Sequence, residues 1–347
     1  MLFHINAITP SHINLWVAPV DMRKVPSIRV SLDRSRHRTI EAHVDFTQLK
    51  EWGWHATGRC GFDLNDETCP DLAGARHVEI HDSDTNVLLY SRSELLGATP
   101  RRLLALDYTI DQANGLRDDL HARFQASYFG LDAMHHDVLR CTFDVQYTNS
   151  LYFHGNVLFK RYEDLVSKNE FLRTILVVDP YVELAKRLLW LRRFAQVAED
   201  RSQWWRVEHV LDPCLFAIEL NLEDAAAMKK AFDQIEQKSF DWLANPMTRA
   251  LACARPDEKF VPKHWVGAIE TLSRFDVVGH QQHWDDYAAM VYDALGLDAV
   301  PPEPRPIPAG VLQLADRLRK VKSVIPLVDL DLSLDAKVLA AIGQPGR

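Results

Sequence analysis

The sequence predicts an α/β protein: a parallel sheet flanked by helices, preceded by an antiparallel β domain of the sandwich or jelly-roll type. Between residues 13 and 92, short segments alternate apolar and polar side chains and are separated by turn residues, which is typical of strands with one buried face. From residue 103 onwards, short apolar runs alternate with helical periodicity, as in parallel strands that helices cover on both faces. The length of 347 residues is sufficient for two domains.

The first predicted domain spans residues 1–97. Its expected strands are the segments "SIRVSLD", "TIEAHVDF", "RCGFDLN", "HVEIHDSD" and "NVLLYSR", and their short, regular spacing favours a sandwich or jelly roll. Between them, "WGWHATGRCGF" contains Trp52 and Trp54 among three glycines. Such a tryptophan pair either packs beneath the sheet or stacks on a sugar ring. The domain is therefore a candidate for binding a glycan or a partner protein.

The second predicted domain spans residues 98–298, and the composition changes at "SRSELLGATPRR" where it begins. Its expected strands are "LLALDY", "SLYFHG", "RTILVVD" and "RFDVVG". Helical patterns follow these runs, and they cover residues 115–127, 159–168, 180–199, 222–244 and 282–296. Residues 299–347 then form a proline-rich arm, a helix over residues 311–322 and an apolar tail. The arm and tail dock either on the protein itself or on a second copy, which makes a homo-oligomer a candidate assembly.

Charge and composition exclude several classes of protein. The formal net charge is −8 and the isoelectric point is near 6.0, without the basic face that non-specific nucleic-acid binding needs. The chain begins "MLFHINAITP", which is not a signal peptide, and no apolar run is long enough to span a membrane. We therefore expect a cytoplasmic protein. The five cysteines include no CxxC pair, as expected for buried thiols in a reducing compartment.

Two histidine-rich patterns were weighed as metal sites. His77, Glu79 and His81 share one face of a strand, and "HQQHWDD" places histidines and aspartates at residues 280–286. The first pattern also fits a solvated strand face, and the two aspartates also fit the first turn of a helix, where they complement the helix dipole. We therefore expect no metal.

The β domain resembles a small domain of bacterial polysaccharide-assembly proteins. In that family a glycine-rich turn ending in "GF" precedes a last hairpin that ends in "LLYRR". The corresponding features here are Gly53, Gly58, Gly61, Phe62 and the segment at residues 88–92. The resemblance implies a protein that acts on, or assembles with, a surface polysaccharide.

Three segments of the second domain resemble carbohydrate sulfotransferases in the same order along the chain. "LDYTIDQANGLRDDLHARF" lies where that family carries its donor-binding loop. "LYFHGNVLFKRYEDLVSKNEFLRTILVVDPYVELAKRLLWLRR" is similar to the stretch that joins a "HGH"-like strand end to "RDPVERxxSxY", and "RFDVVGHQQHWDDYAAMVYDALGL" resembles a later "FDxVGxxExFDESL" segment. The resemblance implies a sulfotransferase-like P-loop fold, with PAPS as the sulfuryl donor and a carbohydrate as the acceptor.

The resemblance also implies roles for individual residues. His154 lies where the family places its general base. The donor PAPS would contact the strand-to-helix turns and the helices after them, through Gly115, Arg117, Asp179 and Lys186. The carbohydrate acceptor would be bound by basic residues after the "HG" strand and by "WWR", that is, by Lys160, Arg161, Trp204, Trp205 and Arg206. The alternatives are a satisfied core histidine at residue 154, a solvated face for the basic residues and core packing for the tryptophans.

The sequence departs from the family where the donor binds. Ile110 stands at the position of the donor-loop lysine, Asp111 among the small and hydroxylated residues, and Val178 at the position of the arginine for the 3′-phosphate. Each lost charge-assisted contact costs about 1.5–3 kcal/mol. Two functions follow: a sulfotransferase-type transferase with a rearranged donor site, or a glycan-binding or scaffold protein of polysaccharide assembly without catalysis.

Overall fold

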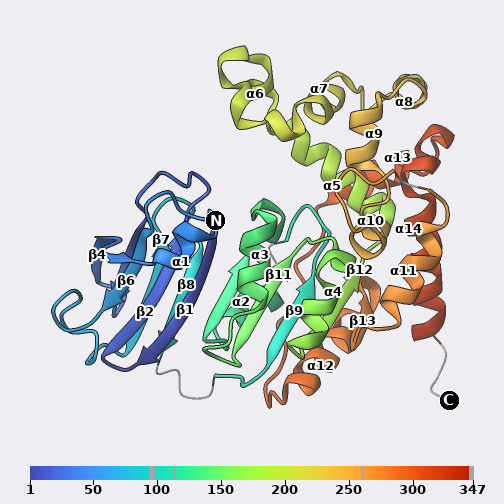
Figure 1. Cartoon of the computed structure of the whole chain (residues 1–347). Coiled ribbons are helices and arrows are strands. Elements are labelled where there is room, and N and C mark those ends of the chain that lie inside the picture. The colour runs from blue at the N-terminus through green and yellow to red at the C-terminus, as the bar shows by residue number, and fades with distance from the viewer. Residues whose placement is uncertain (94–97, 113–114, 260, 344–347) are drawn as a thin grey trace. The chain divides into compact units, whose positions relative to one another are not determined.

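A computed structural model describes residues 1–93, 98–112, 115–259 and 261–343 (Figure 1). The chain divides into two compact units. Unit 1 comprises Met1–Leu104, Leu120–His154 and Asp164–Phe171, and unit 2 comprises Ala105–Asp119, Gly155–Glu163 and Leu172–Arg347. The predicted domain boundary at residues 97 and 98 falls at the end of a segment, residues 94–97, that lies outside the described residues.

The N-terminal part of unit 1 contains two antiparallel sheets, which confirms the antiparallel part of the prediction. Their strand orders are β1-β2-β6-β5 and β4-β3-β7-β8. The strands span Leu2–Thr9 (β1), His12–Ala18 (β2), Ser27–Leu32 (β3), Arg36–Glu41 (β4), Val44–Asp45 (β5), Arg59–Leu64 (β6), His77–Asp82 (β7) and Leu88–Ser93 (β8), and a short helix, α1, spans Thr47–Glu51. The predicted segment "TIEAHVDF" is divided between β4 and β5.

The first two strands were not named from the sequence. In β2 the inward positions Ile13, Leu15 and Val17 are fully buried, whereas β1 is mostly exposed and carries a polar sequence, "LFHINAIT". The strand β1 forms because it pairs with β2 in register from Leu2–Ala18 to Thr9–His12. Pairing with a neighbour therefore determines this strand more than its own hydrophobic pattern does.

The third sheet is parallel, as the sequence predicts, but it has five strands rather than the four expected, in the order β10-β11-β9-β12-β13. Its strands span Arg102–Leu106 (β9), Ala126–Phe129 (β10), Leu151–Gly155 (β11), Leu172–Val177 (β12) and Val277–His280 (β13). The helices that follow the first four strands span Gly115–His121 (α2), His136–Phe143 (α3), Phe159–Lys168 (α4) and Pro180–Arg192 (α5), and Trp284–Leu295 (α12) follows the last.

One predicted helix was too long at its C-terminal end. The pattern over residues 115–127 gives a helix only to His121, and β10 begins at Ala126. In β10 buried and half-buried side chains alternate, with Ala126 and Tyr128 buried. This period of two is that of a strand, and the parallel pairing of β10 with β11 stabilises it.

Unit 2 also contains a group of helices between β12 and β13. They span Ala195–Glu199 (α6), Leu211–Glu219 (α7), Ala225–Asp233 (α8), Gln237–Leu243 (α9), Pro246–Ala252 (α10) and His264–Leu272 (α11). The predicted helix over residues 222–244 is divided into two helices. The first, α8, begins after Asp224, whose side chain accepts hydrogen bonds from the N–H groups of Ala226 and Ala227, and it ends at Asp233. The second, α9, begins at Gln237. The predicted helix over residues 180–199 is likewise interrupted after Arg192.

The C-terminal arm and tail pack on unit 2 itself. Residues 301–308 have no regular secondary structure, and the helices α13 and α14 follow at Ala309–Leu318 and Ile325–Ile342. The helix α13 lies against α5, and its residues Val311, Leu314 and Leu318 belong to one buried cluster with Leu184 and Leu188 of α5. The apolar tail joins the same core through Val324, Leu327 and Val328. Among the described residues, no helix is both long and apolar enough to cross a membrane.

Candidate functional site

The loop after β9 has the strand-to-helix position of the predicted donor loop. Its first residue, Asp107, accepts hydrogen bonds from the backbone N–H and the hydroxyl of Thr109 at 3.0 and 2.7 Å. These bonds fix a tight turn directly after the strand. In parallel sheets, ligands bind at the carboxyl ends of the strands. Residues 113 and 114 of the loop lie outside the described residues.

A side chain of the same unit occupies the hydrogen-bonding position of this loop. The backbone N–H of Ile110 donates to Oε1 of Glu183, from α5, at 2.9 Å. The carboxylate of Glu183 is buried, with 1% of the residue exposed, and it pairs with Arg187 at 2.7 Å. Arg187 in turn donates to the carbonyl oxygen of Tyr108 at 2.7 Å. A carboxylate of the chain thus lies where an external anion would accept a backbone hydrogen bond.

Burial changes the proton affinity of the acids around this loop. Desolvation raises the pKa of Glu183, although Arg187 and Lys186 oppose the shift. Desolvation also raises the pKa of Asp107 to about 6, against the hydrogen bonds of Thr109. Both carboxyl groups therefore hold protons at higher pH than free acids do, which is common at functional sites but also occurs in structural ion-pair networks.

The residues predicted to bind the donor are engaged by other groups. A Cβ built on Gly115, the first residue of α2, would lie 3.4 Å from Pro302 of the proline-rich arm. Arg117 pairs with Asp118 at 2.7 Å. Asp179 caps α5 by accepting from the N–H groups of Tyr181 and Val182, and it also pairs with Arg319. Of the predicted donor residues, Lys186 is the one whose charge acts on the loop, through Asp107 and Glu183.

The predicted acceptor residues are dispersed. His154 is buried near the end of β11, with its ring 6.0 Å from that of Tyr152 and 6.4 Å from that of Phe129. Lys160 extends towards α11, where a Cβ built on Gly267 would lie 2.8 Å from its ammonium group. Arg161, on α4, is exposed.

The segment Arg201–Arg206 forms a short 3₁₀ helix rather than part of a joint site. The indole N–H of Trp204 donates to the carbonyl oxygen of Ala198 at 2.7 Å, and the Arg201 guanidinium lies 5.6 Å from the centre of its ring. Arg206 donates to Gln203 at 2.9 Å, and Trp205 is 76% exposed. The contacts of Trp204 and Arg206 are thus local.

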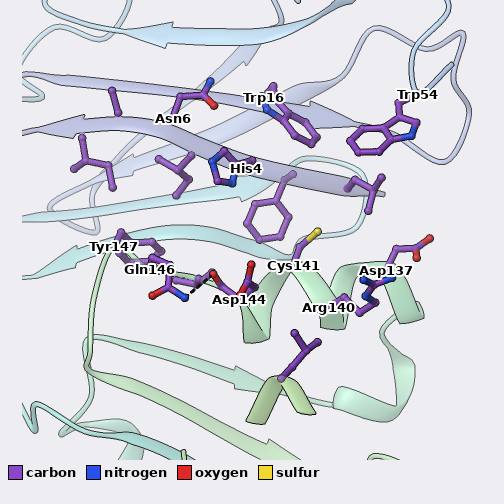
Figure 2. Close-up of a pocket in the computed structure, with 17 residues that line it drawn as sticks. His4, Asn6, Trp16, Trp54, Asp137, Arg140, Cys141, Asp144, Gln146 and Tyr147 are labelled. Carbon is purple, nitrogen blue, oxygen red and sulfur yellow. Dashed lines mark hydrogen bonds between the residues drawn. The ribbon is translucent and has the colours of Figure 1, made fainter. Parts of the chain in front are cut away.

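A cavity of about 630 Å³ lies within unit 1 (Figure 2). The rings of His4, Trp16 and Trp54 line one wall in a row, and the ring of Trp52, which does not itself line the cavity, packs against Trp54. The rings of His4 and Trp16 are 6.2 Å apart, those of Trp16 and Trp54 are 6.0 Å apart, and those of Trp54 and Trp52 are 5.1 Å apart. Trp54 is 39% exposed and Trp52 is 58% exposed. The row is therefore accessible to a ligand, unlike a tryptophan pair packed in a core.

The opposite wall of the cavity comes from α3 and the segment after it (Figure 2). It presents groups that donate or accept hydrogen bonds, namely Asp137, Arg140, Asp144, Gln146 and the backbone around them. The side chain of Gln146 is held by Asn169, at 2.8 Å, and by the carbonyl oxygen of Asp144, at 3.2 Å. Flat aromatic faces opposite oriented polar groups are suited to an amphipathic ligand such as a sugar.

The sequence pointed to one part of this cavity only. Trp52 and Trp54 were recognised as candidates for stacking on a sugar, whereas His4, Trp16 and the α3 wall were missed. The signal that could have found Trp16 is the alternation of β2, which directs Asn14 and Trp16 away from the buried positions Ile13 and Leu15.

No family model, curated protein or solved structure matches the chain. A proposal for the function of this chain therefore rests on its residues and their geometry. Of the two regions, the carboxyl end of β9 is occupied by the chain's own carboxylate, and the unit 1 cavity has an open aromatic wall. The cavity is the stronger candidate for binding a ligand.

Proposed function

We propose that this protein recognises a carbohydrate in the unit 1 cavity and does not use PAPS as a substrate. The observation that carries the proposal is the aromatic wall of the cavity, formed by His4, Trp16 and Trp54, in which Trp54 is 39% exposed and polar groups lie opposite. The resemblance of the β domain to polysaccharide-assembly proteins supports a glycan as the ligand.

The chemistry of the cavity favours recognition through stacking and hydrogen bonds. The apolar face of a pyranose ring fits against an indole ring, and its hydroxyl groups need donors and acceptors at the edge. Asp137 and Asp144 accept hydrogen bonds, Arg140 donates them, and Gln146 does both. Because acids and an arginine are both present, the cavity does not select a ligand by net charge alone.

The proposal includes a finer description of the fold. We infer a β-sandwich of the polysaccharide-assembly type followed by a sulfotransferase-like α/β region whose donor site has been lost. The buried Glu183 supports the loss, because its carboxylate accepts the hydrogen bond of Ile110 and would repel a phosphate group at that position.

Glycan-array screening followed by calorimetry with the best ligand tests the proposal. We expect Trp54→Ala to weaken binding by about tenfold or more, which corresponds to about 1.4 kcal/mol. Trp205→Ala is the matched control, because Trp205 is an exposed tryptophan of unit 2 with 76% exposure and should leave the affinity unchanged. A screen without any ligand, or equal losses in the two variants, would contradict the proposal.

A second candidate, a carbohydrate sulfotransferase-type enzyme, is favoured by His154 at the carboxyl end of β11, where the resemblance places a general base. It requires transfer of the sulfuryl group from PAPS to the bound glycan, with release of PAP. Formation of PAP that depends on both the glycan and His154 would establish this enzyme in place of a purely binding protein.

A further inference from the structure

A cysteine, a glutamate and a histidine meet in the connection between α10 and α11, apart from both regions described above. Cys253 directly follows α10, Glu258 lies in the loop, and His264 begins α11. One ligand atom from each residue lies within 4.8 Å of those of the other two. Among the residues that the structure describes, this is the one group of at least three such side chains in which the potential ligand atoms converge in this way.

We propose that Cys253, Glu258 and His264 bind a zinc ion, with a water molecule as the fourth ligand. Thiolate, imidazole and carboxylate are the three kinds of side-chain ligand that Zn²⁺ takes in proteins. Magnesium and calcium prefer oxygen ligands alone, so a site with one sulfur and one nitrogen does not suit them. Three protein ligands and one water give the four-coordinate, tetrahedral geometry that zinc favours.

The surroundings of His264 hold its ring in a suitable orientation. Nδ1 accepts a hydrogen bond from the backbone N–H of Val261 at 3.0 Å and also lies 3.0 Å from the Val261 carbonyl oxygen, and Nε2 lies 3.0 Å from Oε1 of Glu258. Zinc binding at Nε2 requires the tautomer with the proton on Nδ1, which exchanges the hydrogen bond from the Val261 N–H for one donated to the Val261 carbonyl oxygen. A backbone carbonyl in this role is a common outer partner of metal-binding histidines.

Glu258 is also positioned by the loop. Its other carboxylate oxygen, Oε2, accepts a hydrogen bond from the backbone N–H of Ala254 at 2.9 Å. In the absence of metal, Oε1 and Nε2 of His264 share a hydrogen bond. The zinc ion would replace the proton of that bond, so the two ligands already lie near each other before metal binds.

The charges of the proposed site balance. Zinc carries two positive charges, the thiolate and the carboxylate carry one negative charge each, and the imidazole is neutral. A neutral complex matters here, because Cys253 is fully buried and His264 is 6% exposed, and an uncompensated buried charge is costly. Arg249 and Lys160 lie near Cys253, and they would disfavour a complex with a net positive charge.

Metal binding must release the thiol proton. Binding forms the zinc–sulfur bond and releases one proton to solvent, while the ring proton of His264 moves from Nε2 to Nδ1 with no net release. The affinity should therefore increase with pH.

Titration of the metal-free, full-length protein with cobalt(II), used as a spectroscopic substitute for zinc, tests the proposal. We expect one equivalent to bind, with a sulfur-to-cobalt charge-transfer band and intense visible bands typical of tetrahedral coordination. Zinc should displace the cobalt. In Cys253→Ser the charge-transfer band should be lost, and the affinity for zinc should fall by about tenfold or more.

Cys214→Ser is the matched control, because Cys214 is also a fully buried thiol, located in α7, and this variant should bind cobalt like the wild type. Glu258→Gln provides a second variant at a partly exposed position, in case Cys253→Ser does not fold, and it should weaken binding while keeping the charge-transfer band. Binding of well under one equivalent, or equal effects of Cys253→Ser and Cys214→Ser in folded proteins, would overturn the proposal.

Discussion

The backbone N–H of Ile110 donates a hydrogen bond to Oε1 of Glu183 at 2.9 Å. Both residues lie at the carboxyl edge of the parallel sheet. Ile110 is in the loop after β9, and Glu183 is in the first turn of α5, which follows β12. The bond joins a loop of the phosphate-binding type to an internal carboxylate. As a result, the loop is satisfied by the chain itself, and Arg187 balances the charge of the carboxylate.

We expect PAP not to bind to this loop. An incoming phosphate would have to displace the Glu183 carboxylate and would find Ile110 in place of a lysine. Because each missing charge-assisted contact costs about 1.5–3 kcal/mol, the loss of several should abolish measurable affinity. Thermal unfolding with and without millimolar PAP measures this, with AMP as the control nucleotide. A rise in Tm that is specific to PAP would show that a donor site has persisted.

The buried pair of Glu183 and Arg187 should be sensitive to the loss of one partner. In Glu183→Ala the guanidinium of Arg187, which is 7% exposed, would remain buried without its counter-ion, and the free energy of unfolding should fall by about 3–5 kcal/mol. Urea denaturation measures the change. The control is Lys229→Ala, which removes an exposed ion pair with Asp233 and should cost no more than about 0.5 kcal/mol. Equal costs would show that Arg187 reaches solvent in the variant.

Local patterns predicted most of the sheet but little of the two candidate regions. The runs "LYFHG" and "RTILVV" became β11 and β12 because a strand buried on both faces needs a continuous apolar sequence. By contrast, Glu183 follows Pro180 in the first turn of a helix, where an acid complements the helix dipole and does not by itself indicate a further role. Its partner Ile110 lies 73 residues earlier, and no local pattern reports a contact of this kind.

The same reason limited the prediction of the other sites. The sequence identifies Trp54 as a candidate because a tryptophan pair can stack on a sugar ring, whereas Asp137 and Arg140 of α3 complete the cavity without any motif around them. Cys253 and His264 were passed over because their spacing matches no standard zinc motif. In each case the missing information is tertiary, since the residues meet only after the chain has folded.

Asp331 should make the stability depend on pH. Burial raises its pKa from 3.8 to about 6, although Thr248 and Met247 donate hydrogen bonds to it. A raised pKa in the folded state means that the native protein binds the proton more tightly than the unfolded chain does. The contribution of the Asp331 proton to the free energy of unfolding is therefore complete below pH 3.8 and is lost as the pH rises through 6. The shift corresponds to roughly 3 kcal/mol.

The test compares wild type with Asp331→Asn, which cannot titrate at this position, between pH 4 and pH 8. The destabilisation caused by the substitution should be larger at pH 4 than at pH 8 by roughly 2 kcal/mol, because part of the full shift is already lost at pH 4. Asp233→Asn is the control, because Lys229 lowers the pKa of the exposed Asp233 below 3.8, so the effect of this substitution should not change between pH 4 and pH 8. A pH-independent effect of Asp331→Asn would mean that its three hydrogen bonds keep the carboxylate ionised in the folded protein.

Gly279 of β13 should tolerate no larger residue. A Cβ at this position would lie 2.5 Å from Cβ and Cγ of Tyr287, which is buried in α12, and real Cβ atoms do not approach other atoms so closely. Gly279→Ala would therefore force α12 away from the sheet, at a cost of about 1–3 kcal/mol in the free energy of unfolding. Gly310→Ala is the matched control, because a Cβ there meets nothing within 4 Å. Because Gly310 is exposed in the first turn of α13, Gly310→Ala should raise the free energy of unfolding, measured by urea denaturation, by up to about 1 kcal/mol. If both substitutions stabilised the protein, this result would contradict the close approach of Gly279 in β13 to Tyr287 in α12.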